Sequence, residues 1–127
     1  LGELHVCPGG VMAHESYFEI TIRGRGGHGS QPHATIDPVV CGATLVTALQ
    51  TLVSRTVPSN ENAVVSVCQF HAGERNNVIP DTAFLSGTIR DVDEAVCATI
   101  HRRLIELTTG VCQGYGCQVE IDIQNGC

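Results

Sequence analysis

The sequence predicts an α+β fold of two layers, in which two helices cover one face of a four-stranded, mostly antiparallel sheet. Three segments alternate apolar and polar residues with a period of two, as half-buried strands do, and a fourth is rich in strand-forming residues: 14–23, 82–90, 118–123 and 63–70. Two further segments repeat apolar residues every three or four positions, as helices do. The order along the chain is β-α-β-β-α-β, the ferredoxin-like split βαβ arrangement.

The first strand and the loop after it are clearly separated in the sequence. Phe18, Ile20 and Ile22 face one side of the predicted strand, and polar residues face the other. A glycine-rich stretch follows at 24–34. We expect this stretch to be too flexible and too polar to form an element.

The first helix has a strong start at Asp37-Pro38. Asp caps free backbone N–H groups, and Pro at the first helical position loses nothing because its N–H would have no partner there. We expect Pro58 to close the segment. The stripe that faces the sheet consists of Leu45, Val46, Leu49, Leu52 and Val53.

The remaining elements follow the same logic. The strand at 82–90 directs Ala83, Leu85 and Ile89 to one face. The second helix starts near Asp93-Glu94, whose charges suit the positive end of the helix dipole, and Gly114 and Gly116 stop it. Its apolar stripe consists of Cys97, Ile100, Leu104, Leu107 and Val111. The strand at 118–123 then alternates again.

Composition limits the class of protein. The 127 residues suit a single domain (1–127) that buries roughly two-thirds of its unfolded surface. Apolar residues make up 43% and aromatic residues only 4%, so the core must be aliphatic. The net charge of −6 argues against nucleic-acid binding. No apolar run approaches the roughly 20 residues of a membrane span, so we expect no membrane segment.

The seven cysteines are widely spread, and none forms a Cys-x-x-Cys pair. We therefore predict neither a zinc site nor a disulfide framework. Four of them lie within apolar runs, where a free Cys behaves as a small buried hydrophobe. Reduced thiols fit a cytoplasmic protein.

The glycine-rich loop supplies the first candidate site. Residues 24–29 match Gly-x-Gly-x-x-Gly after a strand, but Pro32 intervenes and the helix waits until Asp37. A dinucleotide fingerprint needs its third Gly to open a helix directly, so we reject nucleotide binding. What remains is His28, on a loop whose backbone can approach a ligand closely, with a solvated turn histidine as the alternative. His33 is a weaker candidate that could simply stabilise the loop.

A second candidate site joins Asn77, in a loop, with Arg90, at the end of the strand at 82–90. If both face the wet side of the sheet, they suit a carboxylate, because Arg binds it bidentately and Asn adds a donor. The alternative is a turn-forming Asn and a surface Arg. No His-x-x-x-His or His-Glu-x-x-His spacing occurs, so we predict no metal site in this chain.

Several motifs in register resemble one known family. They are PGGVMA at 8–13, GRGGHGSQPH at 24–33, Asp37-Pro38, Leu49-Gln50, Ala72-Gly73, NVIP at 77–80 and GTIR at 87–90. This pattern, which covers essentially the whole chain, resembles the dimerisation (lid) domain of the metal-dependent aminoacylase and carboxypeptidase family. Within it, the pattern is most similar to hippurate hydrolase-like and indole-acetyl-amino-acid hydrolase-like amidohydrolases.

The resemblance implies a role for each matching position. The histidine of Gly-Gly-His, here His28, would reach into the partner subunit's active site and stabilise the oxyanion. Asn77 and Arg90 would bind the substrate's α-carboxylate. A separate catalytic domain would hold divalent metal ions, such as zinc or manganese, that activate water. This chain would bind no cofactor and would be inactive alone.

The resemblance also implies a homodimer. A ferredoxin-like sheet leaves its second strand at an edge, and that strand carries apolar residues on both faces, which invites pairing with another chain. We therefore expect two copies to join through the second strand and the first helix. The chain does not begin with Met, and we expect it to be part of a longer cytoplasmic enzyme that hydrolyses N-acyl amino acids. The alternative is a free-standing ferredoxin-like regulatory module that binds a small amino-acid ligand.

Overall fold

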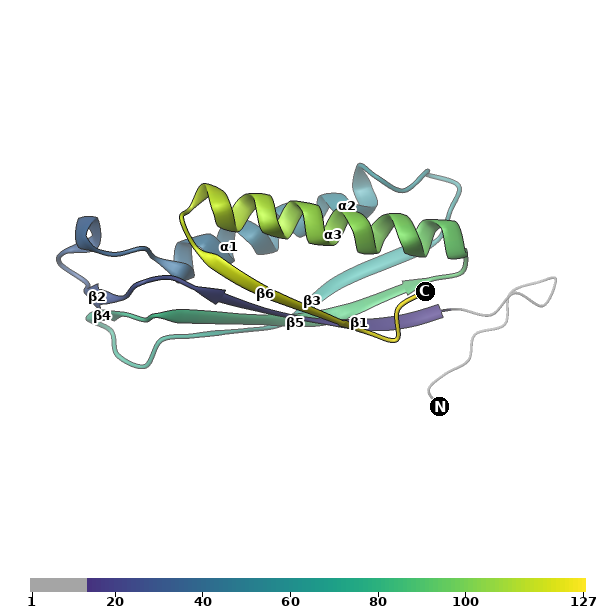
Figure 1. Ribbon diagram of the computed structural model, residues 1–127. Helices are drawn as coiled ribbons and strands as arrows, with labels where there is room; N and C mark the ends of the chain where they lie inside the picture. The colour runs from purple at the N-terminus through teal and green to yellow at the C-terminus, as the bar shows by residue number, and fades with distance from the viewer. Residues whose placement is uncertain (1–13) are drawn as a thin grey trace.

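The computed structural model describes residues 14–127 (Figure 1). The run PGGVMA at 8–13, which carries part of the resemblance, lies outside the described residues. The elements are β1 (His14–Arg23), β2 (Gly27–His28), the 3-10 helix η1 (Pro32–Ala34), α1 (Pro38–Leu49), α2 (Thr51–Ser54), β3 (Ala63–Ala72), β4 (Val78–Ile79), β5 (Thr82–Asp91), α3 (Glu94–Gly114) and β6 (Gln118–Gln124).

The four long strands form one antiparallel sheet in the order β3-β5-β1-β6. The helices lie together on one face of this sheet and leave the other face open (Figure 1). Helix α1 packs over β5 and β3, and α3 packs beside it over β6 and β5. The predicted ferredoxin-like α+β fold is confirmed. The edges are β3 and β6, which are the second and fourth long strands, as expected.

The aliphatic core lies between the helices and the sheet. The period-two pattern of β1 buries Phe18, Ile20 and Ile22, each at most 1% exposed. Strand β5 and the helices complete the core with Ala83, Leu85, Ile89, Cys41, Leu45, Leu49, Leu52, Ile100, Leu104 and Cys112. The residues that the alternation assigned to the inner face of these strands are therefore the ones that pack.

Both long helices begin at an aspartate cap. The Asp37 carboxylate accepts hydrogen bonds from the backbone N–H groups of Val39 (2.8 Å) and Val40 (3.3 Å). The Asp93 carboxylate does the same for Ala95 (2.7 Å) and Val96 (3.2 Å). These bonds satisfy N–H groups that the first turn leaves without partners, so each cap fixes where its helix starts.

Two details of the helices differ from the prediction. The first helical segment is interrupted at Gln50, whose N–H turns back to the carbonyl of Thr47 (3.2 Å), so that α1 and α2 are separate. In the last turns of α3 the buried residues are Thr108 and Cys112, and the predicted Leu107 and Val111 are half-buried. A helix turns every 3.6 residues, so a stripe extended in steps of three and four drifts around it.

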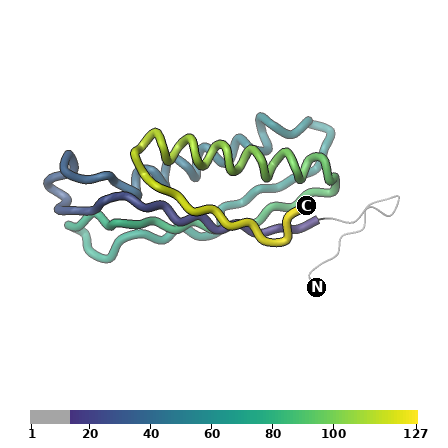
Figure 2. Tube along the Cα trace, viewed as in Figure 1, coloured from purple at the N-terminus to yellow at the C-terminus, as the bar shows by residue number. Residues whose placement is uncertain are grey.

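The glycine-rich loop is more ordered than expected. Gly27 pairs with Ile79 and His28 with Val78, so β2 and β4 form a small second sheet. We call residues 24–36 and 76–81 the tip. The tip extends beyond the helices at the end of the molecule opposite the C-terminus (Figures 1 and 2). Glycine is needed at Gly26, because a Cβ there would collide with the backbone of β4.

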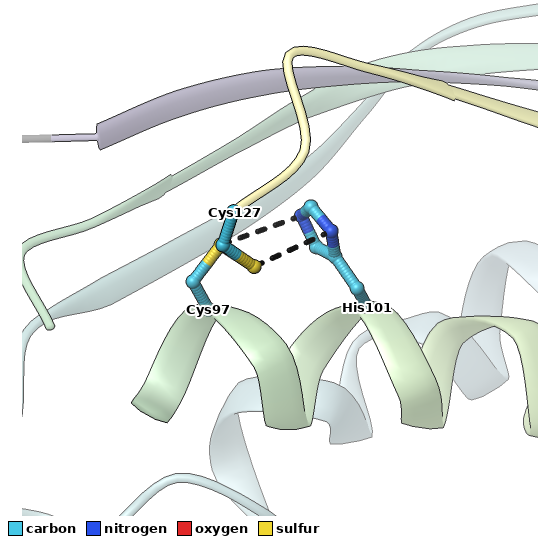
Figure 3. Close-up of side chains that lie close together, drawn as sticks. All are labelled: Cys97, His101 and Cys127. Carbon is cyan, nitrogen blue, oxygen red and sulfur yellow. Dashed lines mark hydrogen bonds between the residues drawn. A yellow bond between two sulfur atoms is a disulfide. The ribbon is translucent and has the colours of Figure 1, made fainter. Parts of the chain in front are cut away.

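The sequence predicted no disulfide framework, and the described residues contain one disulfide that it did not predict. Cys97 on α3 is joined to Cys127 near the C-terminus (Figure 3). The two lie 30 residues apart in the sequence, and the topology alone brings them together. Cys41, Cys112 and Cys117 are buried free thiols, as expected, whereas Cys68 is exposed. None of the described helices is both long and apolar enough to cross a membrane.

Candidate functional site

The His28 imidazole lies at the tip, exposed to solvent, and its orientation is fixed from one side. The backbone N–H of Ser30 donates a hydrogen bond to His28 Nδ1 at 3.1 Å, and Ser30 Oγ lies 2.8 Å from the same nitrogen. A backbone N–H can only donate, so Nδ1 must be the acceptor of the neutral ring. The ring proton is then on Nε2, which is free to donate to a ligand.

The tip also places Asn77 beside the His28 loop. The N–H of Gly29, the residue after His28, donates to the carbonyl of Asn77 at 2.9 Å. The Asp81 carboxylate accepts from the N–H of Gly26 at 2.8 Å, which ties the other side of the loop to the same ribbon. Because backbone hydrogen bonds join the two segments, His28 and Asn77 are neighbouring exposed residues of the tip.

His33 lies on η1 and is exposed within the same tip. The loop that carries it folds back on the His28 segment, because the N–H of Gln31 donates to the carbonyl of His28 at 2.9 Å. His33 is therefore near the candidate site.

Arg90 does not lie at the tip, so within a single chain it is far from Asn77. Strand β5 starts at the tip, where Thr82 pairs with Arg23, and ends where Arg90 pairs with Glu15. The eight steps from Thr82 to Arg90 extend about 26 Å at the rise of a β-strand. Arg90 alternates with buried Ile89 and therefore faces the open side of the sheet, as predicted, but at its far end.

Sequence reasoning passed over Arg75 and His71, which line a surface cavity of about 570 Å³ at the base of the tip. Phe84 and Val78 also contribute to its walls. The His71 ring stacks on Phe84 with centroids 6.5 Å apart. Arg75 is two residues before Asn77, so a single chain brings its guanidinium near the Asn77 turn. The signal was present in the sequence, because Arg75 belongs to the same polar loop.

The tip does not supply a metal site. Among residues 14–127, groups of three potential metal ligands occur only at the opposite end of the sheet, around Cys97. His28 and His33 belong to none of these groups. The exposed tip therefore offers a donor imidazole and a polar amide, which suit an anionic or carbonyl oxygen rather than a cation.

Comparison with known proteins identifies the family to which this chain belongs. Residues 16–111 match the model of the peptidase dimerisation domain. The chain is 36% identical, over 99% of its length, to an N-acetyldiaminopimelate deacetylase from Streptococcus sanguinis and covers 33% of that protein. It is 38% identical, over 94% of its length, to an N-acetylcysteine deacetylase from Bacillus subtilis and covers 32% of it. The chain thus spans about a third of the length of these relatives.

Solved structures give the same result. A putative aminohydrolase from methicillin-resistant Staphylococcus aureus matches with a TM-score of 0.87 and 34% identity, over 90% of this chain and 29% of that one. A dinuclear metal-binding peptidase from Bacillus subtilis matches with a TM-score of 0.68 and 28% identity, over 90% of this chain and 26% of that one. In sequence and in fold, this chain belongs to the peptidase dimerisation domain family.

Proposed function

We propose that this chain is the dimerisation and substrate-binding domain of a metal-dependent amidohydrolase that hydrolyses N-acyl amino acids. Membership of the dimerisation domain family and the two N-acetyl amino acid deacetylases among its relatives support this proposal. The observation that carries it is the His28 ring, exposed at the tip with Nδ1 held by Ser30. The chain spans about a third of those relatives, so the activity is assigned to the longer protein and not to this chain alone.

His28 would act on the carbonyl oxygen of the scissile amide. As water adds to the carbonyl carbon, negative charge develops on this oxygen, and a donor already in position stabilises it. The Nε2–H of His28 is such a donor, because Ser30 occupies the other ring nitrogen. Asn77, bonded to the same loop through its carbonyl, would add an amide donor for the substrate's carboxylate.

The metal ions of the proposed enzyme would lie in a separate catalytic domain. The residues of the tip do not fit a metal, since none belongs to a group of potential ligands within the described chain. Divalent ions such as zinc or manganese in that other domain would activate water. The metal-binding peptidase among the structural relatives supports this part of the proposal.

The proposed homodimer forms through β3 and α1. Strand β3 pairs only with β5 within residues 14–127, and it exposes Val64 (53%) and Phe70 (39%). Helix α1, which packs over this half of the sheet, exposes Val39 (37%) and Val40 (49%). Two copies that pair β3 with β3 antiparallel would make one eight-stranded sheet and cover this edge.

This dimer would give Arg90 a role that it lacks in one chain. Antiparallel pairing about a two-fold axis reverses the second copy, so the tip of one protomer and the Arg90 end of its partner lie toward the same end of the joined sheet. His28 and Asn77 of one protomer and Arg90 of the other would then face one cleft. In such a dimer Arg90 could bind the carboxylate together with Asn77 of the partner protomer, although it is far from Asn77 of its own chain.

The decisive experiment is His28→Ala in the longer protein that contains this chain. We expect kcat for N-acetyl amino acids to fall by about 10²–10³, as for loss of an oxyanion donor. His33→Ala, on the same tip, is the matched control and should have a much smaller effect. An unchanged kcat for His28→Ala would remove His28 from the mechanism. Hippurate and indole-acetyl amino acids, tested beside N-acetyl amino acids, would identify the preferred acyl group.

We further propose that the protein works in the cytoplasm. Three buried free thiols, Cys41, Cys112 and Cys117, support a reducing compartment. The Cys97–Cys127 disulfide favours an oxidising one. Labelling of free thiols in freshly lysed cells would decide: alkylation of Cys97 supports the cytoplasm, and a protected Cys97–Cys127 pair opposes it.

A further inference from the structure

A second cluster of reactive side chains lies at the end of the sheet opposite the tip. His14 begins β1 and Asp91 ends β5, and the two residues pair directly in the sheet register. Cys97 and His101 lie one turn apart on α3, which packs on this part of the sheet. Cys127 approaches both α3 residues from the C-terminal segment (Figure 3). Four separate segments thus converge on one sulfur, that of Cys97.

The distances around Cys97 are those of a ligand set. Its Sγ lies 3.5 Å from His14 Nδ1 and 3.7 Å from His101 Nε2. His14 Nδ1 lies 4.0 Å from Asp91 Oδ1, and the ligand atoms of His14, Asp91 and Cys97 are all within 4.8 Å of one another. In a tetrahedral zinc site, with bonds of about 2.0–2.3 Å, neighbouring ligand atoms are about 3.3–3.8 Å apart. His101 belongs to a second such group, with Cys97 and Cys127, so its ring would have to turn toward His14 and Asp91 to complete a tetrahedral set.

Asp91 gives an independent reason to expect a cation. Its side chain is 0% exposed, and neither carboxylate oxygen has a hydrogen-bond partner within residues 14–127. An ionised carboxylate without partners in an apolar interior is costly, and buried charges are normally paired or bound to a metal. His14, at 4.0 Å, is too far to satisfy it by a hydrogen bond.

We propose that, once a low-molecular-weight thiol has reduced the disulfide by exchange to two thiols and is itself oxidised to a disulfide, His14, Asp91 and Cys97 bind a divalent transition-metal ion of the zinc class, with His101 as the fourth ligand. The donor set of two imidazoles, one thiolate and one carboxylate suits zinc. His101 would exchange its 2.9 Å hydrogen bond with Ser16 Oγ for the metal. Binding releases the proton of the Cys97 thiol and involves no change of oxidation state.

The metal site and the disulfide are alternatives, because each uses the same sulfur. In a reducing compartment, cysteines that lie among histidines are more often metal-binding than disulfide-bonded. Cys127 lies 3.7 Å from His101 Nδ1 and is outside the proposed ligand set. This site is about one strand length away from His28, and the proposal does not depend on the proposed function.

The test uses the 127-residue chain and Cys127→Ser, which frees the Cys97 thiol without any reductant. Zn²⁺ titrated by calorimetry should bind this variant at one equivalent. Co²⁺ should give the thiolate charge-transfer band and the intense d–d bands of a tetrahedral site. Each of Cys97→Ser, His14→Gln and Asp91→Asn, introduced into the Cys127→Ser variant, should weaken Zn²⁺ binding. Loss of an outer-shell partner weakens metal binding by roughly 10–100-fold, and loss of a direct ligand should weaken it by more. Cys68→Ser, an exposed thiol outside the cluster, is the matched control and should bind like its parent.

Asp91→Asn also separates a binding role from a structural one. Since Asp91 is buried without partners, the amide should leave the metal-free fold intact by circular dichroism while weakening Zn²⁺ binding. Failure of Cys127→Ser to bind Zn²⁺ would overturn the proposal, as would undiminished binding by the Asp91→Asn or His14→Gln variant. Binding by the reduced native chain but not by Cys127→Ser would place the ion on Cys97, His101 and Cys127 instead, which also overturns it.

Discussion

The backbone N–H of Ser30 donates a hydrogen bond to Nδ1 of His28 at 3.1 Å, and this one contact decides which nitrogen of the imidazole can donate to a ligand. Ser30 Oγ, 2.8 Å from the same nitrogen, adds a second contact. Substitution at Ser30 can therefore remove the side-chain contact while it leaves the backbone donor, and with it the Nε2–H tautomer, in place.

Ser30→Ala in the longer enzyme should accordingly lower kcat by only about 2- to 10-fold, the equivalent of one ordinary hydrogen bond. His28→Ala, by contrast, should lower it far more. Steady-state kinetics of both variants with one N-acetyl amino acid checks this order. If Ser30→Ala were as inactive as His28→Ala, the hydroxyl and not the backbone N–H would control the ring.

The position of Arg90 leads to a prediction about mixed dimers. His28→Ala and Arg90→Ala should each impair the homodimer, the latter chiefly through KM because it weakens carboxylate binding. A dimer of one His28→Ala and one Arg90→Ala protomer has one fully native cleft if His28 and Arg90 meet from different chains. Mixing the two variants should then restore kcat/KM to about half of the native value in dimers that contain both.

The control for this experiment is a mixture of His28→Ala with Asn77→Ala. Both residues lie at one tip, so each cleft of that mixed dimer carries one altered residue and neither cleft is native. This mixture should therefore show no recovery of activity. No recovery in the His28→Ala and Arg90→Ala mixture would mean that these two residues do not come together from different chains.

Local patterns in the sequence predicted most of the fold, and long-range contacts explain what they missed. Alternation in β1 and the aspartates before α1 and α3 are local signals, and each was correct. Asn77 and Arg90 are near in sequence, but an extended strand separates them in space. His14 and Asp91 are far apart in sequence, yet pairing of β1 with β5 places them opposite each other. The motif resemblance singled out His28 and Asn77 as site residues, which remains a prediction, whereas the cluster around Cys97 has no sequence spacing that reveals it.

The exposed edge of β3 predicts how the dimer can be broken. Val64→Lys would place a charge on an edge strand that is 53% exposed at this side chain. We expect the dissociation constant of the dimer to rise by about tenfold or more, because edge lysines oppose strand pairing. Sedimentation equilibrium measures this directly. Ile105→Lys, at a similarly exposed position (45%) on α3, is the control and should leave the dimer intact.

Buried thiols predict how stability changes in alkali. Burial, followed by the neighbouring Cys112, raises the pKa of the Cys41 thiol from 9.0 to about 12. Burial likewise raises the pKa of Cys117 to about 11. The folded chain keeps these protons at pH values where the unfolded chain has lost them, so the stability that they contribute is complete below pH 9 and falls as the pH rises toward 12.

Each thiol should therefore cost up to about 1.4 kcal/mol of unfolding free energy per pH unit over that window. The chain contains no lysine, so cysteine and tyrosine dominate its titration in this range. Urea denaturation at a series of pH values between 8 and 11 measures the slope. Cys41→Ala should lower stability at every pH because it leaves a cavity, but its free energy of unfolding should fall less steeply with pH than that of the native chain. Equal slopes for both proteins would mean that Cys41 ionises as readily in the folded state as in the unfolded state.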